Sequence, residues 1–376
     1  MNRLTRLLAL LFFLTVLPLA AQELTYKPGG GVSLTSAEAQ WRLRLLGYIQ
    51  NTYTVHTRTE NDAISNEFFI RRARLDIIFD YRDRYQIFFE LDARGSRTEM
   101  VLAQFDVRYF GPHSIRFGKY ITPFSPENTR SSRSLTTVER YSGLNAMFLL
   151  PALDTQYGIM FFGAVSPLTY YLSVSNGNGK ASQNLREDND AKDVQGRLVL
   201  ALSSHLKAGV SGNYADESPQ ALPLVDHTFN SFNRAAIGGK RYGWLADMEY
   251  QKLPFLLRGE VFQYRFDAPL SETQQVDAFL GGYGEVGWFL YGDYRDGLQL
   301  IGRVETARYG DTVTGFAGPT RLVSYLVGND WYRDGVFRLQ VNLIYESADA
   351  PSPLADSRFT GHDDSIGFLS MLQLKF

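Results

Sequence analysis

The sequence predicts an all-β fold, namely a transmembrane antiparallel β-barrel of about 16 strands. Three observations support this prediction. The chain begins like an exported protein and has no later apolar run of helical membrane length. Segments of about ten residues alternate apolar and polar side chains, and long and short polar connections alternate between these segments.

Residues 1–21 have the form of a secretory signal peptide. Two arginines precede an apolar run from Leu7 to Leu17, and small residues stand at Ala20 and Ala21. This run is shorter than the roughly 20 apolar residues that cross a bilayer as a helix. We therefore expect cleavage near Ala21, followed by a short N-terminal segment, residues 22–40. A buried N-terminal helix is the alternative.

The composition restricts the possible functions. The chain has 376 residues and no cysteine, so the exported protein would be stable without disulfide bonds. Tyrosine (22) and phenylalanine (26) are abundant, and the formal net charge is −2. A nucleic-acid-binding protein is usually clearly basic, so no nucleic acid partner is predicted.

The strand pattern is clear in "VFRLQVNLIY", residues 336–345. Phe337, Leu339 and Val341 alternate with polar side chains, as expected for a strand with one apolar and one polar face. The barrel is predicted to occupy residues 41–376. Its strands are expected to begin near Trp41, Glu67, Arg84, Glu99, His113, Thr155, Leu168, Asp193, Leu206, Lys240, Phe255, Val276, Gly297, Arg321, Val336 and Asp364.

The connections between these strands alternate in length. Short ones, such as Asp80–Asp83 and Lys252–Pro254, separate long polar ones, such as Thr54–Asn66 and Ser175–Lys192. This rhythm indicates a meander with tight turns at one end and long loops at the other. A soluble β-sandwich would less readily show this regular alternation of long and short connections. A sheet of this size in a membrane must close to pair every backbone group, and about 16 strands leave a water-filled lumen.

The longest connection, about residues 121–154, is the third long one. It contains "ENTRSSRSLTTVER", Glu127 to Arg140, which is rich in arginine and hydroxyl groups. The following apolar residues, Ala146 to Leu153, suggest burial rather than disorder. Within a barrel, such a segment can fold into the lumen.

Several stretches resemble the phosphate-selective porin O and P family. They are "FFIRRARLDIIFDYRDRYQIFFELDA" (Phe68–Ala93), "IRFGKYITPFSPENTRSSRSLTTVER" (Ile115–Arg140), "PALDTQYGIMFFG" (Pro151–Gly163) and "YYLSVSNGNG" (Tyr170–Gly179). The resemblance covers most of the mature chain. It implies a bacterial outer-membrane barrel of sixteen strands in lipid, often a homotrimer. The third long loop would fold inward and narrow the channel. The terminal Phe376 would be the signal read by the barrel assembly machinery.

The resemblance also implies a pore lined by cations that bind phosphate. The "RRAR" motif falls on Arg71, Arg72 and Arg74. With Leu75 facing lipid, strict pleating places Arg72 and Arg74 in the lumen. Arg71 then faces outward, unless a bulge turns it or it lies at a subunit contact.

The remaining candidate residues lie on the long loop and on other strands. Guanidinium groups bind phosphate through forked hydrogen bonds, and hydroxyls can donate to the same oxygens. The direction of Lys119 at a strand end is left open by the pleating. The candidate pore-lining or anion-binding residues, besides the "RRAR" motif, are Arg94, Arg108, Arg116, Lys119, Arg130, Ser131, Ser132, Arg133 and Arg140.

Acids accompany these cations. The predicted lumen also holds Glu90, Asp92, Asp106, Glu260 and Glu305. The three arginines of the long loop are matched by Glu127, Glu139 and Asp154, so the loop is neutral overall. Phosphate selectivity is therefore one hypothesis. The other is that the arginines mainly pair with acids across the lumen and brace the wall.

The predicted function is passive diffusion of small hydrophilic solutes, with anions such as phosphate as one hypothesis. An adhesin or scaffold with a plugged lumen is an alternative, and a barrel hydrolase is a less favoured one. The five histidines show no metal-ligand spacing, and no G-x-S-x-G motif occurs. No catalytic residue, metal or cofactor is predicted.

Overall fold

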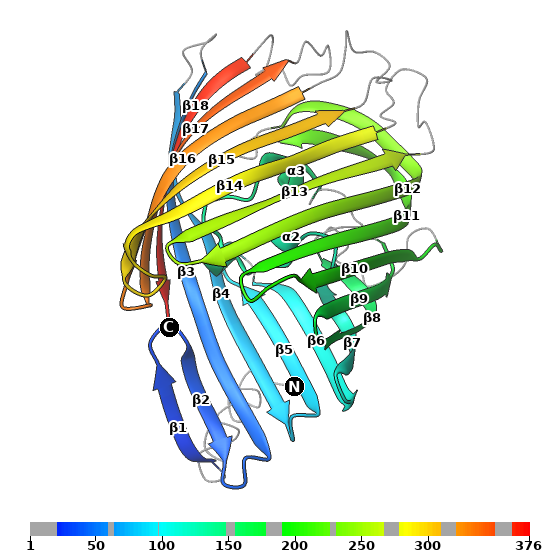
Figure 1. Ribbon diagram of the computed structural model, residues 1–376, viewed down its shortest axis with the longest axis vertical. Helices are drawn as coiled ribbons and strands as arrows, with labels where there is room; N and C mark the ends of the chain where they lie inside the picture. Colours follow the sequence, from blue (N-terminus) through cyan, green and yellow to red (C-terminus); the bar gives the residue numbers. More distant parts are fainter. Residues whose placement is uncertain are drawn as a thin grey trace.

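The computed structural model describes residues 21–58, 64–96, 98–147, 155–177, 190–225, 231–266, 278–309, 321–349 and 363–376. Within these residues, sixteen strands form a closed antiparallel barrel and a two-stranded hairpin precedes them (Figure 1). The expected signal peptide, residues 1–21, falls almost wholly outside the described residues. No helix in the described part of the chain is long and apolar enough to cross a membrane.

The barrel strands follow the chain in order. They are β3 (Trp41–Arg58), β4 (Ile64–Tyr81), β5 (Tyr85–Asp92), β6 (Glu99–Phe110), β7 (His113–Ile121), β8 (Thr155–Val165), β9 (Leu168–Ser175), β10 (Asp193–Ala201), β11 (Leu206–Val225), β12 (Ser231–Lys252), β13 (Phe255–Phe266), β14 (Ala278–Gly292), β15 (Gly297–Tyr309), β16 (Arg321–Arg333), β17 (Phe337–Asp349) and β18 (Asp363–Lys375).

Each barrel strand pairs antiparallel with the next, and β18 returns to pair with β3. The closing register runs from Ser365 opposite Arg58 to Lys375 opposite Tyr48. Closure leaves no free edge among the described barrel strands. Their backbone N–H and C=O groups can therefore form hydrogen bonds that lipid cannot provide. The predicted sixteen-stranded barrel is confirmed.

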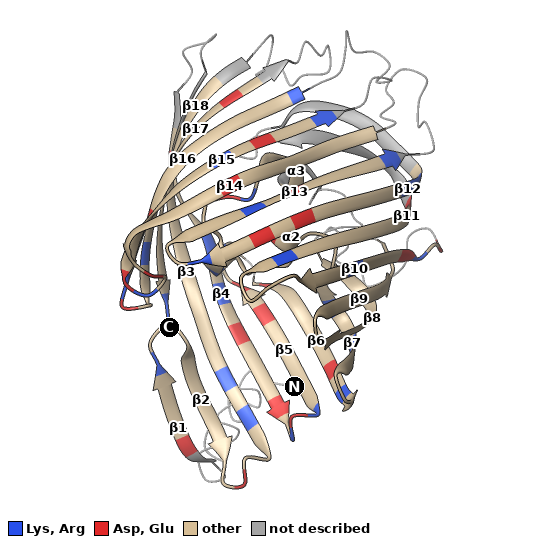
Figure 2. Ribbon diagram, viewed as in Figure 1, with Lys and Arg blue, Asp and Glu red and all other residues tan. Residues whose placement is uncertain are grey.

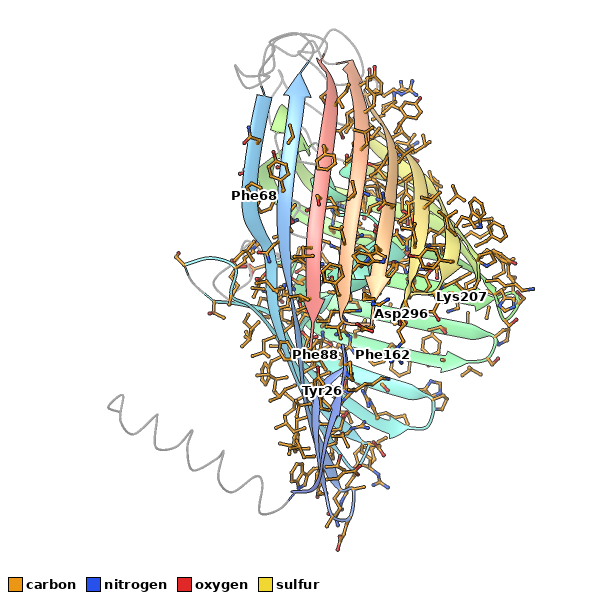
Figure 3. The ribbon with its side chains drawn as sticks, turned by 90° about the vertical axis from the view of Figure 1, so that its left-hand side faces the viewer. Tyr26, Phe68, Phe88, Phe162, Lys207 and Asp296 are labelled. Atoms are coloured by element: carbon orange, nitrogen blue, oxygen red, sulfur yellow. The ribbon has the colours of Figure 1, made fainter. Side chains whose placement is uncertain are left out.

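The two faces of the wall differ in chemistry. Along β13, Phe255, Leu257 and Val261 are exposed, whereas Arg258 and Glu260 between them are buried. The same alternation recurs along the other strands, so apolar side chains stand outward from the wall (Figure 3). The outer face is therefore suited to lipid, and the polar face is enclosed by the barrel.

Buried charges on the inner face pair between strands that are adjacent or one strand apart. Arg197 on β10 contacts Asp247 on β12 at 2.6 Å, and Arg303 on β15 contacts Glu285 on β14 at 2.6 Å. Figure 2 shows opposite charges on adjacent strands, for example on the lower parts of β3 and β4. Pairing lets the interior carry charge without isolated buried ions.

A hairpin of β1 (Ala21–Lys27) and β2 (Gly31–Ser36) extends the wall. β2 pairs with β3 from Val32 opposite Leu45 to Thr35 opposite Arg42, just beyond the last pair of β18 with β3. The hairpin therefore lies in line with β17 and β18, below the C-terminus (Figures 1 and 3).

The C-terminal residue is held at this junction. The backbone N–H of Phe376 donates to the Gly47 carbonyl at 3.0 Å, and the Gly47 N–H donates back at 3.3 Å. A Cβ atom at Gly47 would lie 2.7 Å from the Phe376 ring and 2.6 Å from the Arg74 carbonyl. Gly47 is thus required for the close approach of the terminal ring.

We expect Gly47→Val to destabilise the barrel by about 1 to 3 kcal/mol through this overlap. The measurement is the temperature at which the folded barrel converts to the slower unfolded band on a gel. Gly212→Val is the matched control, because a Cβ at Gly212 meets no atom within 4 Å. Equal conversion temperatures for the two variants would contradict the prediction.

Candidate functional site

A short helical segment follows β7. It contains α2 (Pro126–Thr129), the 3₁₀ turn η1 (Ser132–Ser134) and α3 (Ser142–Met147). Ser125 caps α2 by accepting a hydrogen bond from the Asn128 backbone N–H, and Pro126 occupies the first turn. The rest of the predicted loop, residues 148–154, lies outside the described residues.

One side of this segment is bonded to acids of the barrel wall. Ser125 Oγ donates to Glu260 at 2.8 Å, and the Tyr141 hydroxyl donates to the same carboxylate at 2.6 Å. Thr136 Oγ1 donates to Glu285 at 2.6 Å. Burial, together with the Glu260 charge, raises the pKa of Tyr141 well above its usual value, so its hydroxyl remains a donor.

Glu127 connects the segment to wall arginines. Its fully buried carboxylate lies 3.3 Å from Arg303 Nη2 and 3.9 Å from Arg258 Nη2. Both arginines also contact Glu285, at 2.6 and 2.9 Å respectively. Two acids and two arginines therefore form one buried network between the segment and strands β13 to β15.

An apolar contact continues this attachment. Val138 belongs to a buried cluster with side chains of β15 to β18, and its backbone N–H donates to Asn342 Oδ1 at 2.8 Å. The other members of the cluster are Ile301, Leu326, Ile344, Leu369 and Met371. The segment is thus fixed to the wall along β13 to β18.

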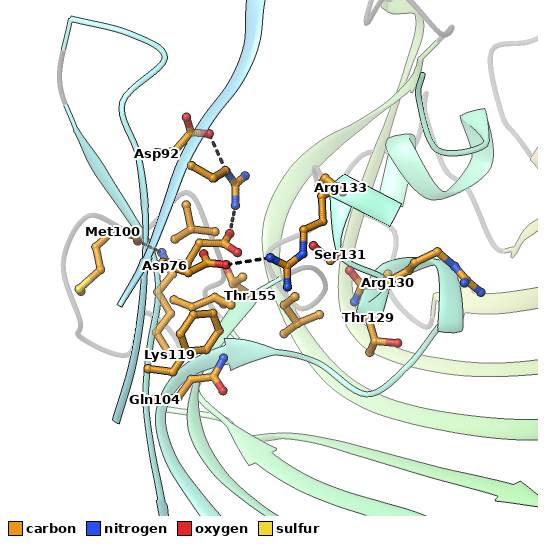
Figure 4. A pocket seen from close by; sticks show the side chains of 18 of the residues that line it. Asp76, Asp92, Met100, Gln104, Lys119, Thr129, Arg130, Ser131, Arg133 and Thr155 are labelled. Carbon is orange, nitrogen blue, oxygen red and sulfur yellow. Dashed lines mark hydrogen bonds and ion pairs between the residues drawn. The ribbon is translucent and has the colours of Figure 1, made fainter. Parts of the chain in front are cut away.

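On its other side the segment borders a cavity of about 1420 Å³. Strands β4 to β10 supply the opposite lining (Figure 4). Ten cationic side chains line it, namely Arg71, Arg72, Arg74, Arg94, Arg116, Lys119, Arg130, Arg133, Arg140 and Arg197. Four acids line it, namely Asp76, Glu90, Asp92 and Glu99. The lining side chains are therefore mostly cationic, and several of them pair with acids that stand behind the lining, namely Glu139, Asp106, Asp247 and Glu249.

A β-bulge decides the direction of Arg71. Gln50 on β3 pairs with Arg72, but the next residue, Asn51, pairs with Ile70, so Arg71 is the extra residue. Arg71 consequently reaches Glu139, donating from Nη2 at 3.0 Å and from Nε at shorter range. Of the three possibilities for Arg71, namely an outward direction, a β-bulge or a subunit contact, the structure shows the β-bulge.

Arg72 and Arg74 point into the barrel. Arg72 Nη1 donates to Gln50 at 2.9 Å. Arg74 Nε donates to Asp92 at 2.9 Å, and its Nη1 contacts Glu90. Arg74 therefore connects β4 to β5 at the edge of the cavity.

The other strand arginines differ in exposure and in how closely acids hold them. Arg116 forms a two-pronged contact with Asp106 at 2.7 and 2.9 Å. Arg94 is about one third exposed and lies 3.6 Å from Asp92. Arg108 does not line the cavity, and it lies 3.7 Å from Asp106 and 3.9 Å from Asp80.

The loop arginines point in different directions. Arg133 reaches across to Asp76 at 3.7 Å and is one third exposed, whereas Arg130 turns toward Glu249 on β12 (Figure 4). Arg140 donates to the backbone carbonyls of Glu127 and Arg130 at 2.9 and 2.8 Å.

The predicted hydroxyls and the lysine also reach the cavity. Ser131 and Ser132 line it, and the Ser132 carbonyl accepts a hydrogen bond from Gln50 at 3.2 Å. Lys119 Nζ donates to the Met100 carbonyl at 3.1 Å and lies 5.6 Å from the Tyr157 ring centre. Lys119 therefore faces inward.

Sequence reasoning missed Arg197. It lies on the inner face of β10, lines the cavity and pairs with Asp247 at 2.6 Å. Exposed Val194 and Leu198 flank it at outward positions, so the alternation of "DVQGRLVLA" could have placed it inward.

The two described acids of the segment lie in ion pairs with arginines. Glu127 is buried against Arg303 of the wall, whereas Glu139 pairs with Arg71 of the cavity lining, and neither acid is itself part of the lining. The segment presents its three arginines to the cavity. Guanidinium groups and hydroxyls in this arrangement suit an oxyanion. Among the described residues, no cluster of metal-binding side chains occurs.

Comparisons with known proteins agree with this architecture. The model of the family "Phosphate-selective porin O and P" matches residues 43–357. The chain is 21% identical to "Porin O" of Pseudomonas aeruginosa over 415 aligned positions, covering 94% of this chain and 93% of that protein.

Solved structures show the same fold at low identity. The anion-selective porin from Comamonas acidovorans superposes with a TM-score of 0.63 at 10% identity, covering 89% of this chain and 100% of that one. OmpT of Vibrio cholerae, in a trimer form, gives a TM-score of 0.59 at 11% identity over 89% of this chain and 99% of that one.

Proposed function

The chain belongs to the phosphate-selective porin O and P family and is a porin channel of the bacterial outer membrane, and from this premise we propose that it favours small anions, including phosphate. Small hydrophilic solutes diffuse through it down their gradients. Transport of this kind involves no covalent step and no cofactor.

The charge asymmetry of the lumen carries this proposal. The cavity is lined by ten cations and four acids, while Glu127 of the 122–147 segment is buried against Arg303 of the wall and Glu139 pairs with Arg71. A cationic lining in a narrow, partly desolvated passage raises the local concentration of anions. Phosphate would gain forked hydrogen bonds that chloride cannot form.

We propose that the segment 122–147 narrows the channel from the β13–β18 side. Its hydrogen bonds to Glu260 and Glu285 and its apolar cluster around Val138 support a fixed position. Solute would then pass along β4 to β8, beside Arg72, Arg133 and the serine pair. Arg74 and Arg116, each bonded to an aspartate, would mainly brace this wall.

The expected partners follow from the family and the fold. The outer face suits outer-membrane lipid, and a homotrimer is proposed because OmpT of Vibrio cholerae, a neighbour in fold, is described in a trimer form. Phe376, which follows β18 at the junction with the hairpin, is the proposed contact for the barrel assembly machinery.

Planar bilayer recording tests the anion preference. With a potassium chloride gradient, the reversal potential is expected to have the sign of chloride permeation, and added phosphate is expected to reduce the chloride current. A reversal potential of the opposite sign without an effect of phosphate would overturn the proposal. Absence of steady conductance would instead favour a scaffold with a plugged lumen.

A further inference from the structure

A second basic site lies on the outer face, away from the cavity. It occupies the tight turn between β4 and β5 and the adjoining end of β6. We define this tyrosine–arginine patch as Tyr81, Arg82, Arg84, Tyr85 and Tyr109. None of these residues lines the cavity.

The rings of the patch form a connected surface. Tyr81 and Tyr85 stack with centroids 6.5 Å apart, and Tyr85 meets Tyr109 edge-on at 5.3 Å. The hydroxyls of Tyr85 and Tyr109 lie 3.1 Å apart. Exposed Phe105 stacks on Tyr85 at 6.0 Å and continues the patch into the apolar outer band.

The two arginines lie over these rings. The guanidinium carbon of Arg82 is 5.2 Å from the Tyr81 ring centre, and that of Arg84 is 4.9 Å from the Tyr109 ring centre. Arg82 also donates to the Gln40 side chain at 3.2 Å. Cation–π contact thus holds both positive charges against the outer wall, rather than leaving them to extend into water.

Arginines in two other tight turns form ion pairs with neighbouring aspartates. Arg295 lies 3.8 Å from Asp296, and Arg333 lies 3.7 Å from Asp334. In the described structure, Arg82 and Arg84 make no such ion pair, although Asp83 lies between them in the exposed turn. Their charge is therefore available to an external anion.

We propose that this patch binds the headgroup phosphate of an anionic phospholipid in the leaflet at the tight-turn end of the barrel. Short turns of such barrels face the periplasm, and tyrosines mark the headgroup level. The arginines would donate to the phosphate oxygens, while Phe105 and exposed Phe110 contact the first acyl carbons. The outward position and this apolar surround favour a lipid over free phosphate.

Native mass spectrometry of the intact protein tests this inference. The protein is released from micelles containing equal amounts of phosphatidylglycerol and phosphatidylcholine with identical chains. Wild type is expected to retain more phosphatidylglycerol. Arg82→Gln combined with Arg84→Gln is expected to lower the bound ratio about thirtyfold, since each surface cation contributes about 1 kcal/mol to anionic lipid binding.

The matched control is Arg295→Gln combined with Arg333→Gln, which removes the same charge from two other turns. It is expected to keep the wild-type ratio. Equal ratios in all three proteins, or an equal loss in both double variants, would overturn the specific patch. Retention of inorganic phosphate by the patch, without a lipid preference, would also overturn it. The transport function is tested by bilayer currents in a separate experiment. Failure of the lipid proposal therefore leaves the proposed transport function intact.

Discussion

Replacing Glu285 with alanine is expected to loosen the segment 122–147 and to destabilise the barrel by about 3 to 5 kcal/mol, the usual cost of removing one partner from a buried charge pair. Glu285 accepts from Thr136 of the segment at 2.6 Å and contacts Arg303 at 2.6 Å. It also lies 2.9 Å from Arg258. Without it, two buried guanidinium groups lose a shared carboxylate and the segment loses an attachment.

The stability change is measured as a lower conversion temperature of the folded band on gels. The channel change is measured as increased noise in single-channel currents, because the segment would fluctuate beside the passage. Wild-type melting together with quiet currents would show that Glu285 does not hold the segment.

A second variant separates loosening of the segment from general misfolding. Ser125→Ala, Thr136→Val and Tyr141→Phe together remove three side-chain hydrogen bonds to Glu260 and Glu285 but leave the wall carboxylates in place. This triple variant is expected to assemble and to give noisy currents. Quiet currents from the triple variant would mean that the ion pairs of Glu127 and Glu139, together with the Val138 cluster, suffice to fix the segment.

The barrel could be predicted because its signal is local. Period-two alternation and turn residues are read within each segment, without knowledge of the partner strand. Even the glycine-rich strand expected near Val276 forms, as β14, because glycine makes room for neighbours. A Cβ at Gly281 would lie 2.4 Å from the Phe262 ring.

Strand ends away from the tight turns were predicted less well. β12 begins at Ser231 rather than near Lys240, and β4 begins at Ile64 rather than near Glu67. Backbone pairing continues into the long-loop side beyond the apolar band, and polar residues pair there as readily as apolar ones. Alternation alone therefore underestimates the length of these strands.

The geometry of the site could not be predicted, because it depends on contacts between residues that are distant in the sequence. The inward turn of Arg71 follows from the register between β3 and β4, which side-chain types do not reveal. Glu127 meets Arg303, 176 positions away, and this removes its charge from the cavity. Glu139 likewise meets Arg71, 68 positions away, so the arginine partners of both described acids of the loop could not be identified from the sequence.

The anion preference is expected to depend most on cations that are accessible and weakly held. Arg94 and Arg133 line the cavity, and each is about one third exposed. Their ion pairs are long, 3.6 Å to Asp92 and 3.7 Å to Asp76. Because exposed pairs of this kind contribute only about 0 to 1 kcal/mol to stability, both can be neutralised without unfolding the barrel.

Arg94→Gln combined with Arg133→Gln is expected to lower the chloride-to-potassium permeability ratio by at least about thirtyfold. A unit charge about 8 Å from a passing anion is worth about 2 kcal/mol at an effective dielectric constant of about 20. Salt screening reduces this to about 1 kcal/mol for each arginine, which together gives the expected factor. The measurement is the reversal potential in a salt gradient, and the effect is expected to grow as ionic strength falls.

Arg295→Gln is the matched control, because Arg295 lies exposed in a tight turn and does not line the cavity. It is expected to keep the wild-type reversal potential. Arg74→Gln provides a second comparison: Arg74 is bonded to Asp92, so its loss frees an acid at the cavity edge and is expected to lower folding stability as well as selectivity. If neutralising Arg94 and Arg133 left the permeability ratio unchanged while Arg74→Gln affected only stability, the cations of this cavity would be braces of the wall. The anion preference would then have to arise elsewhere in the barrel.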